Sequence, residues 1–277
     1  MVGIPYETWS GAGNTFVLVE AALLREPIAP PDLARLACAA GRASAAAVDG
    51  LLLVSGDEVR LWNRDGSPAE FCGNGARCHA ARLLQRSGSQ RVRFLFGRHS
   101  IEGWREQGRI GVTVPPPCRA RRQPTRAALG GALAPLEEDL ARIGLIHAGV
   151  PHLCLLLRGP ARSDLRRTAP ALRQHPFFAP NGTNVTFLWQ TGLWRQAPEG
   201  EVRTFERGVE DFTQACGSGA VAGAAMLMGQ GSASRAQLRV ASGDWLAVER
   251  NGPVWTLSGP ASRVAEGLLS PDPGRRF

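Results

Sequence analysis

Two cysteines stand at the head of near-identical segments in the two halves of the chain. Residues 72–81 read Cys-Gly-Asn-Gly-Ala-Arg-Cys-His-Ala-Ala and residues 216–225 read Cys-Gly-Ser-Gly-Ala-Val-Ala-Gly-Ala-Ala. A thiol at a helix start meets unsatisfied N–H groups and partial positive charge, which favour a thiolate and bind anions. Two such starts would clamp a carboxylate and place a thiol on each side of one carbon. That arrangement suits removing a proton from one face and returning it on the other.

A residue type that the chain lacks narrows the chemistry further. No lysine occurs, so all 32 residues in the Lys-plus-Arg count are arginine. A pyridoxal-phosphate racemase needs a Schiff-base lysine, and a P-loop nucleotide site needs its lysine. Both are excluded, so a change of stereochemistry at carbon would have to be made by side chains alone.

Length and composition set the broad class. The 277 residues fit one large domain or two medium ones, and the repeated segment favours two. There is no run of 18 apolar residues and no signal-peptide pattern, which predicts neither a membrane span nor a membrane partner. Six cysteines without compact framework spacing indicate reduced thiols and a cytoplasmic protein.

The net charge of +8 leaves two interpretations open. One is a nucleic-acid partner bound through Arg119, Arg121, Arg122 and Arg126. The other is a solvated linker in a protein that uses arginine in place of lysine throughout. The second is favoured, and no nucleic-acid partner is expected, because aromatic residues are not interleaved with the basic stretch and no nucleic-acid fold signature is present.

Hydrophobic patterning places the cysteine segments among strands. The three expected helices begin near residue 31, after Cys72 and after Cys216, and end near residues 40, 86 and 228. A hairpin is expected around residues 55–57. The Ala-rich residues 39–47 are expected to be a helix end or loop. Expected strands lie at 16–20, 51–54, 59–62, 92–96, 100–104, 109–114, 153–157, 184–189, 201–205, 237–240, 245–249 and 254–258. The Pro115–Pro117 break marks the domain boundary.

Six ordered motifs, spread over nearly the whole chain, resemble those of the diaminopimelate epimerase family. They are Gly11-Ala-Gly-Asn-Thr-Phe16, Asn63-Arg-Asp-Gly-Ser67, Phe71-Cys-Gly-Asn-Gly-Ala-Arg-Cys78, Gly149-Val-Pro-His152, Gly182-Thr-Asn-Val-Thr-Phe187, and Glu206-Arg-Gly208 leading into Ala215-Cys-Gly-Ser-Gly-Ala220. Proline racemase and phenazine-pathway isomerases share the wider fold, but not the combination of Asn63, Asn184 and Glu-Arg-Gly.

The resemblance implies an α+β fold of two pseudo-symmetric halves, each a curved, mostly antiparallel sheet wrapped around a central helix. Residues 1–117 would form the half with Cys72 and residues 118–262 the half with Cys216, with the site in the cleft between them. Residues 263–277 would pack back on the first half, and a homodimer is expected.

The resemblance also implies an isomerase that uses no cofactor and no metal. Cys72 and Cys216 would be the acid and base, one thiol and one thiolate. The remaining matched positions would bind the substrate: Asn14, Asn63, Gly73, Asn74, Gly75, His152, Asn184, Glu206, Arg207, Gly217, Ser218 and Gly219. Among these, backbone N–H groups from Asn74, Gly75 and residues 217–219 would hold the α-carboxylate. The asparagines at 14, 63 and 184 and Arg207 would bind the distal amino acid group.

Each site residue also has a structural explanation. Asn14 could cap a turn, and Asn184 could satisfy the hydrogen bonds at a strand end. Arg207 could be a surface charge, and His152 could be a core imidazole whose hydrogen bonds are satisfied. The two repeated cysteines could be small core residues. Cys38, Cys78, Cys118 and Cys154 lack repeat partners and are expected to be core or surface thiols, although a disulfide or metal pair of Cys72 with Cys78 stays open.

Departures from the family pattern leave the substrate open. Thr15 stands where the family usually has Asp, Val150 where it commonly has Asn, and Ser218 where it has Thr. The segment from Cys38 to Gly50 is longer than its family counterpart and lacks the expected glycines. Two alternatives therefore stand beside diaminopimelate epimerisation: racemisation of a single amino acid on the same fold, and a catalytically inactive basic binding protein.

Overall fold

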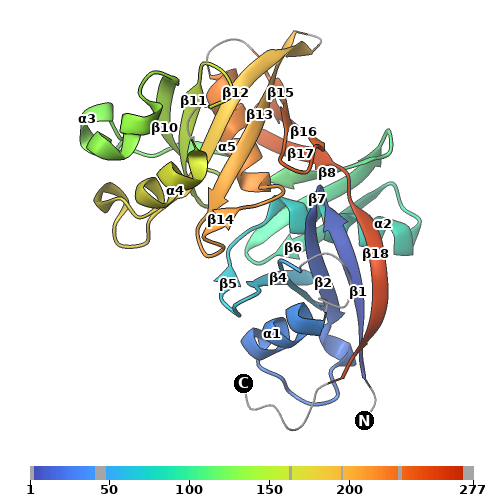
Figure 1. Ribbon diagram of the computed structural model, residues 1–277. Helices are drawn as coiled ribbons and strands as arrows, with labels where there is room; N and C mark the ends of the chain where they lie inside the picture. Colours follow the sequence, from blue (N-terminus) through green and yellow to red (C-terminus); the bar gives the residue numbers. More distant parts are fainter. Residues whose placement is uncertain (1–2, 41–47, 162–163, 195, 230–232, 271–277) are drawn as a thin grey trace. The chain divides into compact units, whose positions relative to one another are not determined.

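The computed structural model describes residues 3–40, 48–161, 164–194, 196–229 and 233–270. The chain divides into two compact units (Figure 1). Unit 1 comprises Met1–Thr113 and Gly259–Phe277, and unit 2 comprises Val114–Ser258. The division lies four residues before the boundary expected at each of 117/118 and 262/263. Residues 271–277 of the expected returning tail lie outside the described part of the chain.

Unit 1 is built from a curved sheet. Its long strands are β1 (Ile4–Gly11), β2 (Asn14–Glu20), β3 (Gly50–Ser55), β4 (Glu58–Asn63), β6 (Arg91–Phe96), β7 (His99–Glu106), β8 (Arg109–Val114) and β18 (Ser262–Leu269), with the two-residue β5 (Pro68–Ala69). The helices are α1 (Pro30–Ala40), α2 (Gly73–Ser87) and the short η1 (Ala21–Leu23). The C-terminal strand β18 pairs with β1 in antiparallel register, Ile4 opposite Leu269.

The strands of unit 2 follow the same plan as those of unit 1. They are β9 (Cys118–Arg119), β10 (Leu140–His147), β11 (Pro151–Leu157), β12 (Asn184–Trp194), β13 (Ala197–Glu206), β14 (Asp211–Phe212), β15 (Arg235–Arg239), β16 (Trp245–Asn251) and β17 (Val254–Gly259). The helices are α3 (Arg126–Leu129), η3 (Gly130–Leu136), α4 (Leu165–Arg173), η4 (Pro176–Phe178) and α5 (Gly217–Met228).

The two units repeat one order of strand pairings. From β1 through β2, β3, β4, β6 and β7 to β8 the successive pairs are antiparallel, parallel, antiparallel, parallel, antiparallel and antiparallel. The series from β10 through β11, β12, β13, β15 and β16 to β17 has the identical sequence of pairings. The internal repeat seen at the two cysteines therefore extends to the whole topology.

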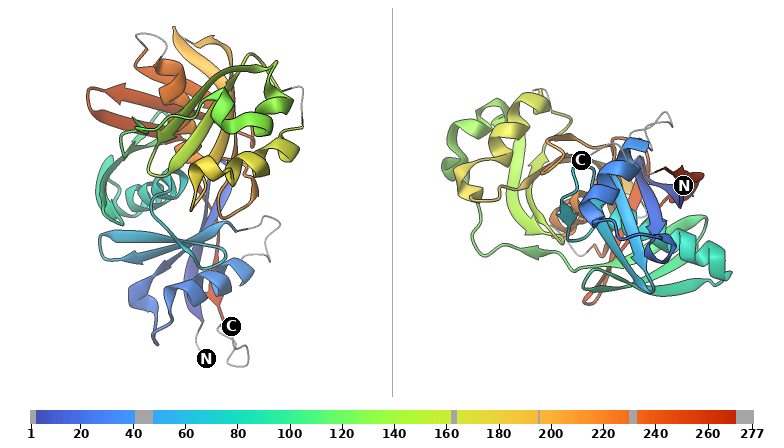
Figure 2. Two further views of the ribbon diagram at one scale, coloured as in Figure 1. Left: turned by 90° about the vertical axis from the view of Figure 1, so that its left-hand side faces the viewer. Right: turned by 90° about the horizontal axis from the view of Figure 1, so that it is seen from below.

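Each unit buries its sheet against two helices. In unit 1, Val17 and Leu51 pack with α1, whereas Leu52, the next residue along β3, lies beside Gly75 of α2. Successive side chains of a strand point to opposite faces, so the middle of β2 (residues 16–19) and of β3 (residues 51–54) is continuously apolar because both faces are covered. In unit 2, α4 packs on one face of β11 and β12 and α5 on the other, where Leu188 meets Gly223. Figure 2 shows the same helices from two further directions.

The expected hairpin and the ends of the expected helices are confirmed. β3 and β4 flank Gly56, and α2 ends at Gly88, whose φ of 66° is the left-handed conformation that glycine adopts readily. β1, β10, β18 and α4 are elements that the sequence patterns did not indicate. Part of the Ala-rich segment, residues 41–47, lies outside the described residues. Within the described chain, no helix combines the length and apolar character needed to cross a membrane.

Candidate active site

Cys72 is the N-cap of α2. Its backbone is extended, with φ −141° and ψ 112°, and its Sγ accepts from the backbone N–H of Gly75 at 3.4 Å. The side chain is half-buried. An N-cap acceptor satisfies one of the orphan N–H groups of a helix start, and a sulfur in that position is stabilised as thiolate by the same groups.

Cys216 occupies the equivalent position on α5. It has φ −125° and ψ 108°, and its Sγ accepts from Gly219 N–H at 3.3 Å. Gly219 has no room for a side chain, because a Cβ there would lie 2.3 Å from Thr204 Oγ1 and 3.2 Å from the Cys216 sulfur. The two expected catalytic cysteines thus share one local geometry.

The other four cysteines lack this environment. Burial raises the pKa of Cys78 to about 12 and raises the pKa of Cys154 as well. Cys38 is buried and Cys118 is exposed. All six cysteines are described residues, and no disulfide joins any two of them, so the possible Cys72–Cys78 disulfide is wrong. The structure separates two helix-capping thiols from four that cap no helix.

Asn14 and Asn74 are brought together in unit 1. Asn74 Nδ2 donates to Asn14 Oδ1, and Asn14 Nδ2 donates to Asp49 Oδ2 at 3.2 Å. Both asparagines are buried. Asn63 takes a different position, in the turn after β4, where its Nδ2 donates to Ser67 Oγ at 3.0 Å. Its amide therefore serves the local turn in this structure.

A polar chain in unit 2 runs inward from Cys216. Cys216 Sγ lies 3.4 Å from Ser218 Oγ, which lies 3.0 Å from His152 Nε2. His152 Nδ1 is 2.8 Å from Thr186 Oγ1, which is 3.2 Å from Thr204 Oγ1. Complete burial lowers the pKa of His152 to about 3, so its imidazole is neutral at pH 7. The neutral ring can orient the Ser218 hydroxyl, but it contributes no positive charge to the site.

Asn184, Glu206 and Arg207 gather at the ends of β12 and β13. Asn184 Oδ1 accepts from Arg207 N–H at 2.8 Å, and its Nδ2 approaches His152 Nε2 at 3.4 Å. Glu206 accepts from Thr213 Oγ1 at 2.5 Å. No ion pair to the Arg207 guanidinium occurs within the described part of the chain.

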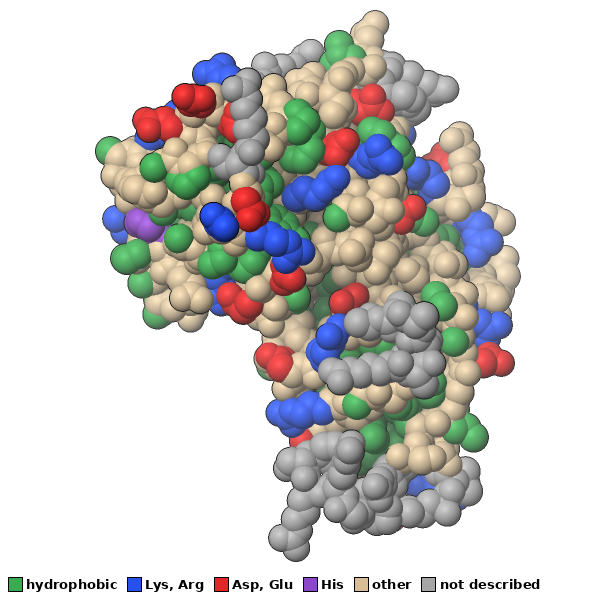
Figure 3. Space-filling view, in the orientation of Figure 1, with side chains coloured by type: hydrophobic (Ala, Val, Ile, Leu, Met, Phe, Trp, Pro, Cys, Tyr) green, Lys and Arg blue, Asp and Glu red, His purple; other side chains and the backbone are tan. Residues whose placement is uncertain are grey.

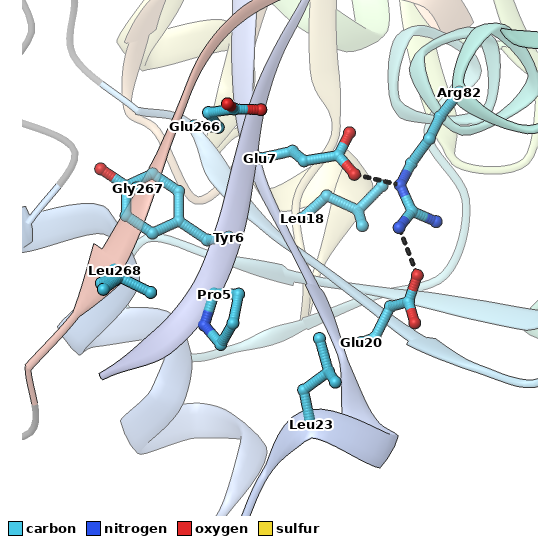
Figure 4. Close-up of a pocket in the computed structure, with 10 residues that line it drawn as sticks. All are labelled: Pro5, Tyr6, Glu7, Leu18, Glu20, Leu23, Arg82, Glu266, Gly267 and Leu268. Atoms are coloured by element: carbon cyan, nitrogen blue, oxygen red, sulfur yellow. Dashed lines mark hydrogen bonds and ion pairs between the residues drawn. The ribbon is translucent and has the colours of Figure 1, made fainter. Parts of the chain in front are cut away.

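The side chain of Arg82 holds α2 to the strands of unit 1, at a point of the helix beyond its first turn. Its guanidinium pairs with Glu7 of β1, at 2.9 Å, and with Glu20 of β2 (Figure 4). Hydrogen bonding from Arg82 is the main cause that lowers the pKa of Glu20. Only 5% of the Arg82 side chain is exposed. The helix that begins at Cys72 is therefore held to two strands by a mostly buried ion pair.

The basic stretch is only partly a solvated linker. Arg122 lies over the ring of Phe177 at 4.2 Å, and Arg126 donates to the carbonyl oxygen of Leu140 at 2.5 Å. Figure 3 shows basic and acidic side chains interspersed on the displayed face. Two of the four arginines thus have structural contacts within unit 2.

The sequence reasoning missed Asp49, Thr186 and Thr204. Thr186 could have been found, because it follows Asn184 by two residues and so points to the same face of β12. Asp49 lies one residue before β3. Its role is evident only from the hydrogen bond that it accepts from Asn14, which is distant in the sequence. In the described residues, no three His, Cys, Asp or Glu side chains are placed to hold a metal ion.

Comparison with protein families places these features in a known context. The family model described as diaminopimelate epimerase matches residues 144–264. The diaminopimelate epimerase of Xylella fastidiosa strain M23 is 35% identical over 277 residues, covering 93% of both chains. The diaminopimelate epimerase of Aquifex aeolicus strain VF5 is 30% identical, covering 95% of this chain and 98% of its own.

Solved structures share the fold at low sequence identity. A putative phenazine biosynthesis PhzC/PhzF protein from Clostridium difficile strain 630 has a TM-score of 0.67 at 14% identity, with 96% of this chain and 99% of the other covered. A hydroxyproline epimerase from Agrobacterium vitis, with bound trans-4-hydroxy-L-proline, has a TM-score of 0.64 at 15% identity, with 98% and 93% covered. These likenesses confirm the predicted α+β fold class.

Proposed function

Since the chain belongs to the diaminopimelate epimerase family, we propose that it interconverts LL- and meso-2,6-diaminopimelate by inverting one α-carbon. The observation that carries this proposal is the pair of cysteines, Cys72 and Cys216, that cap two helices in the same geometry. The product would serve lysine and peptidoglycan precursor synthesis.

The reaction needs one base and one acid. In one direction, the thiolate of one cysteine takes the α-proton, so that an S–H bond forms as the Cα–H bond breaks. The other cysteine, as a thiol, then gives its proton to the opposite face of the carbanion. The two sulfurs exchange protonation states in each turnover, and the reverse direction uses them in the opposite order.

The helix starts supply the electrostatic part of the mechanism. The α-carboxylate and the developing charge would be held by backbone N–H groups of the first turns, at Gly73 and Asn74 in one half and at Gly217 and Ser218 in the other. Gly75 and Gly219 are assigned differently from the expectation, because their N–H groups point to the sulfurs. Their donation would stabilise whichever cysteine is the thiolate.

The distal amino acid group would be bound away from the thiols. The Arg207 guanidinium suits the distal carboxylate, since arginine can donate two parallel hydrogen bonds to it. Asn14, Asn63 and Asn184 would bind the remaining polar groups, with Glu206 beside the substrate ammonium. His152, neutral and bonded at both ring nitrogens, would hold Ser218 beside Cys216.

Val150 favours a second candidate, racemisation of a single amino acid. It is half-buried and stands two residues before His152, where the family pattern has a polar residue. An apolar side chain there offers no hydrogen bond to a distal head group. A substrate without a distal head group needs no hydrogen bond at this position, so Val150 would not weaken its binding there.

We further propose that the enzyme acts as a cytoplasmic homodimer without a cofactor. The absence of disulfides among the six described cysteines agrees with a reducing compartment, which the two-thiol chemistry requires. The homodimer rests on resemblance to the family alone.

Solvent exchange tests the proposal directly. Reduced protein is incubated in D₂O with LL- or meso-diaminopimelate, and in parallel with a panel of ordinary amino acids, and α-deuterium is read by mass spectrometry. We expect deuterium uptake and isomer interconversion with diaminopimelate only. Exchange confined to single amino acids would support the racemase, and absence of exchange on every substrate would support the inactive binding protein.

A further inference from the structure

The asparagines of unit 1 belong to a hydrogen-bonded chain whose two ends are charged. At one end is Arg77, fully buried on α2, whose Nη2 donates to Asn74 Oδ1 at 2.8 Å. A guanidinium only donates hydrogen bonds, so it accepts no amide N–H. The oxygen of Asn74 must therefore face Arg77, and its Nδ2 is directed to Asn14 Oδ1, 2.5 Å away.

The other end of the chain is a carboxylate. Asp49 Oδ2 accepts from Asn14 Nδ2 at 3.2 Å and from Thr15 N–H at 2.8 Å. Arg64 lies 3.7 Å from the second carboxylate oxygen. An ionised carboxylate only accepts, so it requires the nitrogen of Asn14 to face it. Asn14 is thus constrained from both sides.

We propose that Arg77 and Asp49 are positioning residues that fix which way the Asn14 amide faces the substrate. The chain of hydrogen bonds begins at Arg77, which only donates, and ends at Asp49, which only accepts. The side-chain amides of Asn74 and Asn14 lie between them. Turning Asn14 over would oppose its nitrogen to the nitrogen of Asn74 and its oxygen to the oxygen of Asp49. Both hydrogen bonds would be lost at once in a buried place.

The fixed direction matters because the Asn14 amide can make further hydrogen bonds besides the two given above. Asn14 spends one N–H on Asp49 and one lone pair on Asn74, which leaves one donor and one acceptor in set positions. A substrate amino acid head offers both an ammonium donor and a carboxylate acceptor. An amide of fixed direction therefore distinguishes the two groups, whereas a freely flipping amide does not. This inference rests on the proposed function, in which Asn14 binds the substrate.

Isosteric replacement tests the acceptor end. In Asp49→Asn the loss of the negative charge weakens the hydrogen bonds from Asn14 Nδ2 and Thr15 N–H, and the new side chain can also present a nitrogen, so Asn14 is held less firmly in one orientation. We expect KM for diaminopimelate to rise roughly 10- to 100-fold, the range for losing a buried hydrogen bond to a charged group, with a smaller change in kcat. Asp57→Asn, an equal change at the exposed hairpin turn, should leave both constants unaltered.

A second variant tests the donor end. Arg77→Gln replaces a group that only donates with an amide that can do either, and KM should rise in the same way. Circular dichroism and the unfolding midpoint show whether the variant is folded. If folded Asp49→Asn and Arg77→Gln both keep the parental KM, the positioning role is wrong.

Side-chain amide NMR gives a readout independent of turnover. In ¹⁵N-labelled parental protein, Asn14 and Asn74 should each give one sharp pair of Nδ2 resonances with slow hydrogen exchange. In Asp49→Asn the Asn14 pair should broaden or double, and in Asp57→Asn it should not. Unchanged Asn14 resonances in Asp49→Asn would overturn the inference even if the parental protein showed no epimerase activity. That lack of activity would by itself refute only the proposed function.

Discussion

At the scale of single residues, His79 couples the stability of α2 to pH. The side chain is buried against Phe94, and neither ring nitrogen has a hydrogen-bond partner within the described residues. Burial lowers its pKa to about 3. Below the ordinary histidine value of about 6.5 the unfolded chain binds a proton that the folded protein does not. The contribution of His79 to stability is therefore fully present above that pH and is lost progressively as the pH drops toward 3.

Replacing His79 by leucine should remove this contribution. We expect the decrease in unfolding free energy between pH 8 and pH 5.5 to shrink by about 1.4 kcal/mol, the share of one such histidine. His152, whose pKa is also about 3, keeps its own share. Urea unfolding at the two pH values measures the change, and exposed His147→Gln is the control. An unaltered pH dependence in His79→Leu would show that this imidazole is not held neutral.

The two thiols should have separable roles at the same scale. If each faces one side of the α-carbon, each is the base for only one stereoisomer. Replacing Cys216 or Cys72 by serine should abolish epimerisation in both directions, because a hydroxyl is a far weaker acid than a thiol. Loss of HF from 3-fluoro-diaminopimelate needs one base only, so each variant should retain it for one isomer. The same isomer preference in both variants would contradict the paired-base assignment.

At the scale of elements, the start of α5 depends on a glycine. Alanine at Gly219 would drive a Cβ into Thr204 Oγ1 and disturb the hydroxyl that bonds Thr186. We expect a loss of about 1–3 kcal/mol in stability from overpacking, together with a large loss of α-proton exchange. Denaturant unfolding and the exchange assay measure both effects.

Gly223, one turn further along α5, is the matched control for Gly219. A Cβ there would meet Leu188 and Leu238 at 3.4 Å, an ordinary contact distance. Gly223→Ala should be neutral or gain up to about 1 kcal/mol from helix propensity. If both alanine variants behave alike, the crowding at the helix start is not what matters.

The ion pairs that hold α2 to the sheet, made by Arg82 and Arg86, allow a similar comparison of two variants. Arg82→Met removes the mostly buried guanidinium that donates to Glu7 and Glu20, and losing hydrogen bonds between charged groups costs about 1.5–3 kcal/mol. Arg86 also pairs with Glu20, but 58% of its side chain is exposed, so Arg86→Met should cost under about 1 kcal/mol. Denaturant unfolding should rank the two variants in this order. Equal losses would mean that the anchor lies elsewhere.

At the scale of the whole molecule, oxidation should control activity. If Cys72 and Cys216 act on opposite faces of one carbon, we expect their thiols to come within disulfide range when the empty site closes. We expect a mild oxidant to abolish epimerisation and dithiothreitol to restore it. A Cys118→Ser protein should respond identically, which separates the effect from oxidation of the exposed thiol. Full activity in protein shown to carry a Cys72–Cys216 bond would refute the two-base mechanism.

Sequence patterns predicted those features of the fold that are determined by residues close together in the chain. The helix starts at Cys72 and Cys216, the Gly88 stop and the hairpin at Gly56 all follow from small residues and caps. β1 was missed because its alternation is weak and it includes Pro5; it pairs with the neighbouring β2 on one edge and with β18, more than 250 residues away, on the other. α4 was missed because Pro170 lies inside it.

Site contacts were predictable only in part, for a similar reason. Asn14 and Asn74 are 60 positions apart and His152 and Ser218 are 66 apart, so no periodicity relates them. Motif resemblance supplied these residues as a set. It gave no indication of Asp49 or Thr204, whose roles depend on partners brought together by the tertiary fold.

The strand β18 has a consequence for how the protein is made. Unit 2 is continuous in sequence, so all its strands are available before synthesis ends. Unit 1 waits for β18, which follows all the strands of unit 2 in the chain, and until then the edge of β1 that β18 covers is unpaired and open to other chains. The half that is synthesised first is therefore completed last. A chain cut before β18 would lack a strand of the unit that holds its N-terminal residues, whereas every strand of unit 2 up to Ser258 would be present.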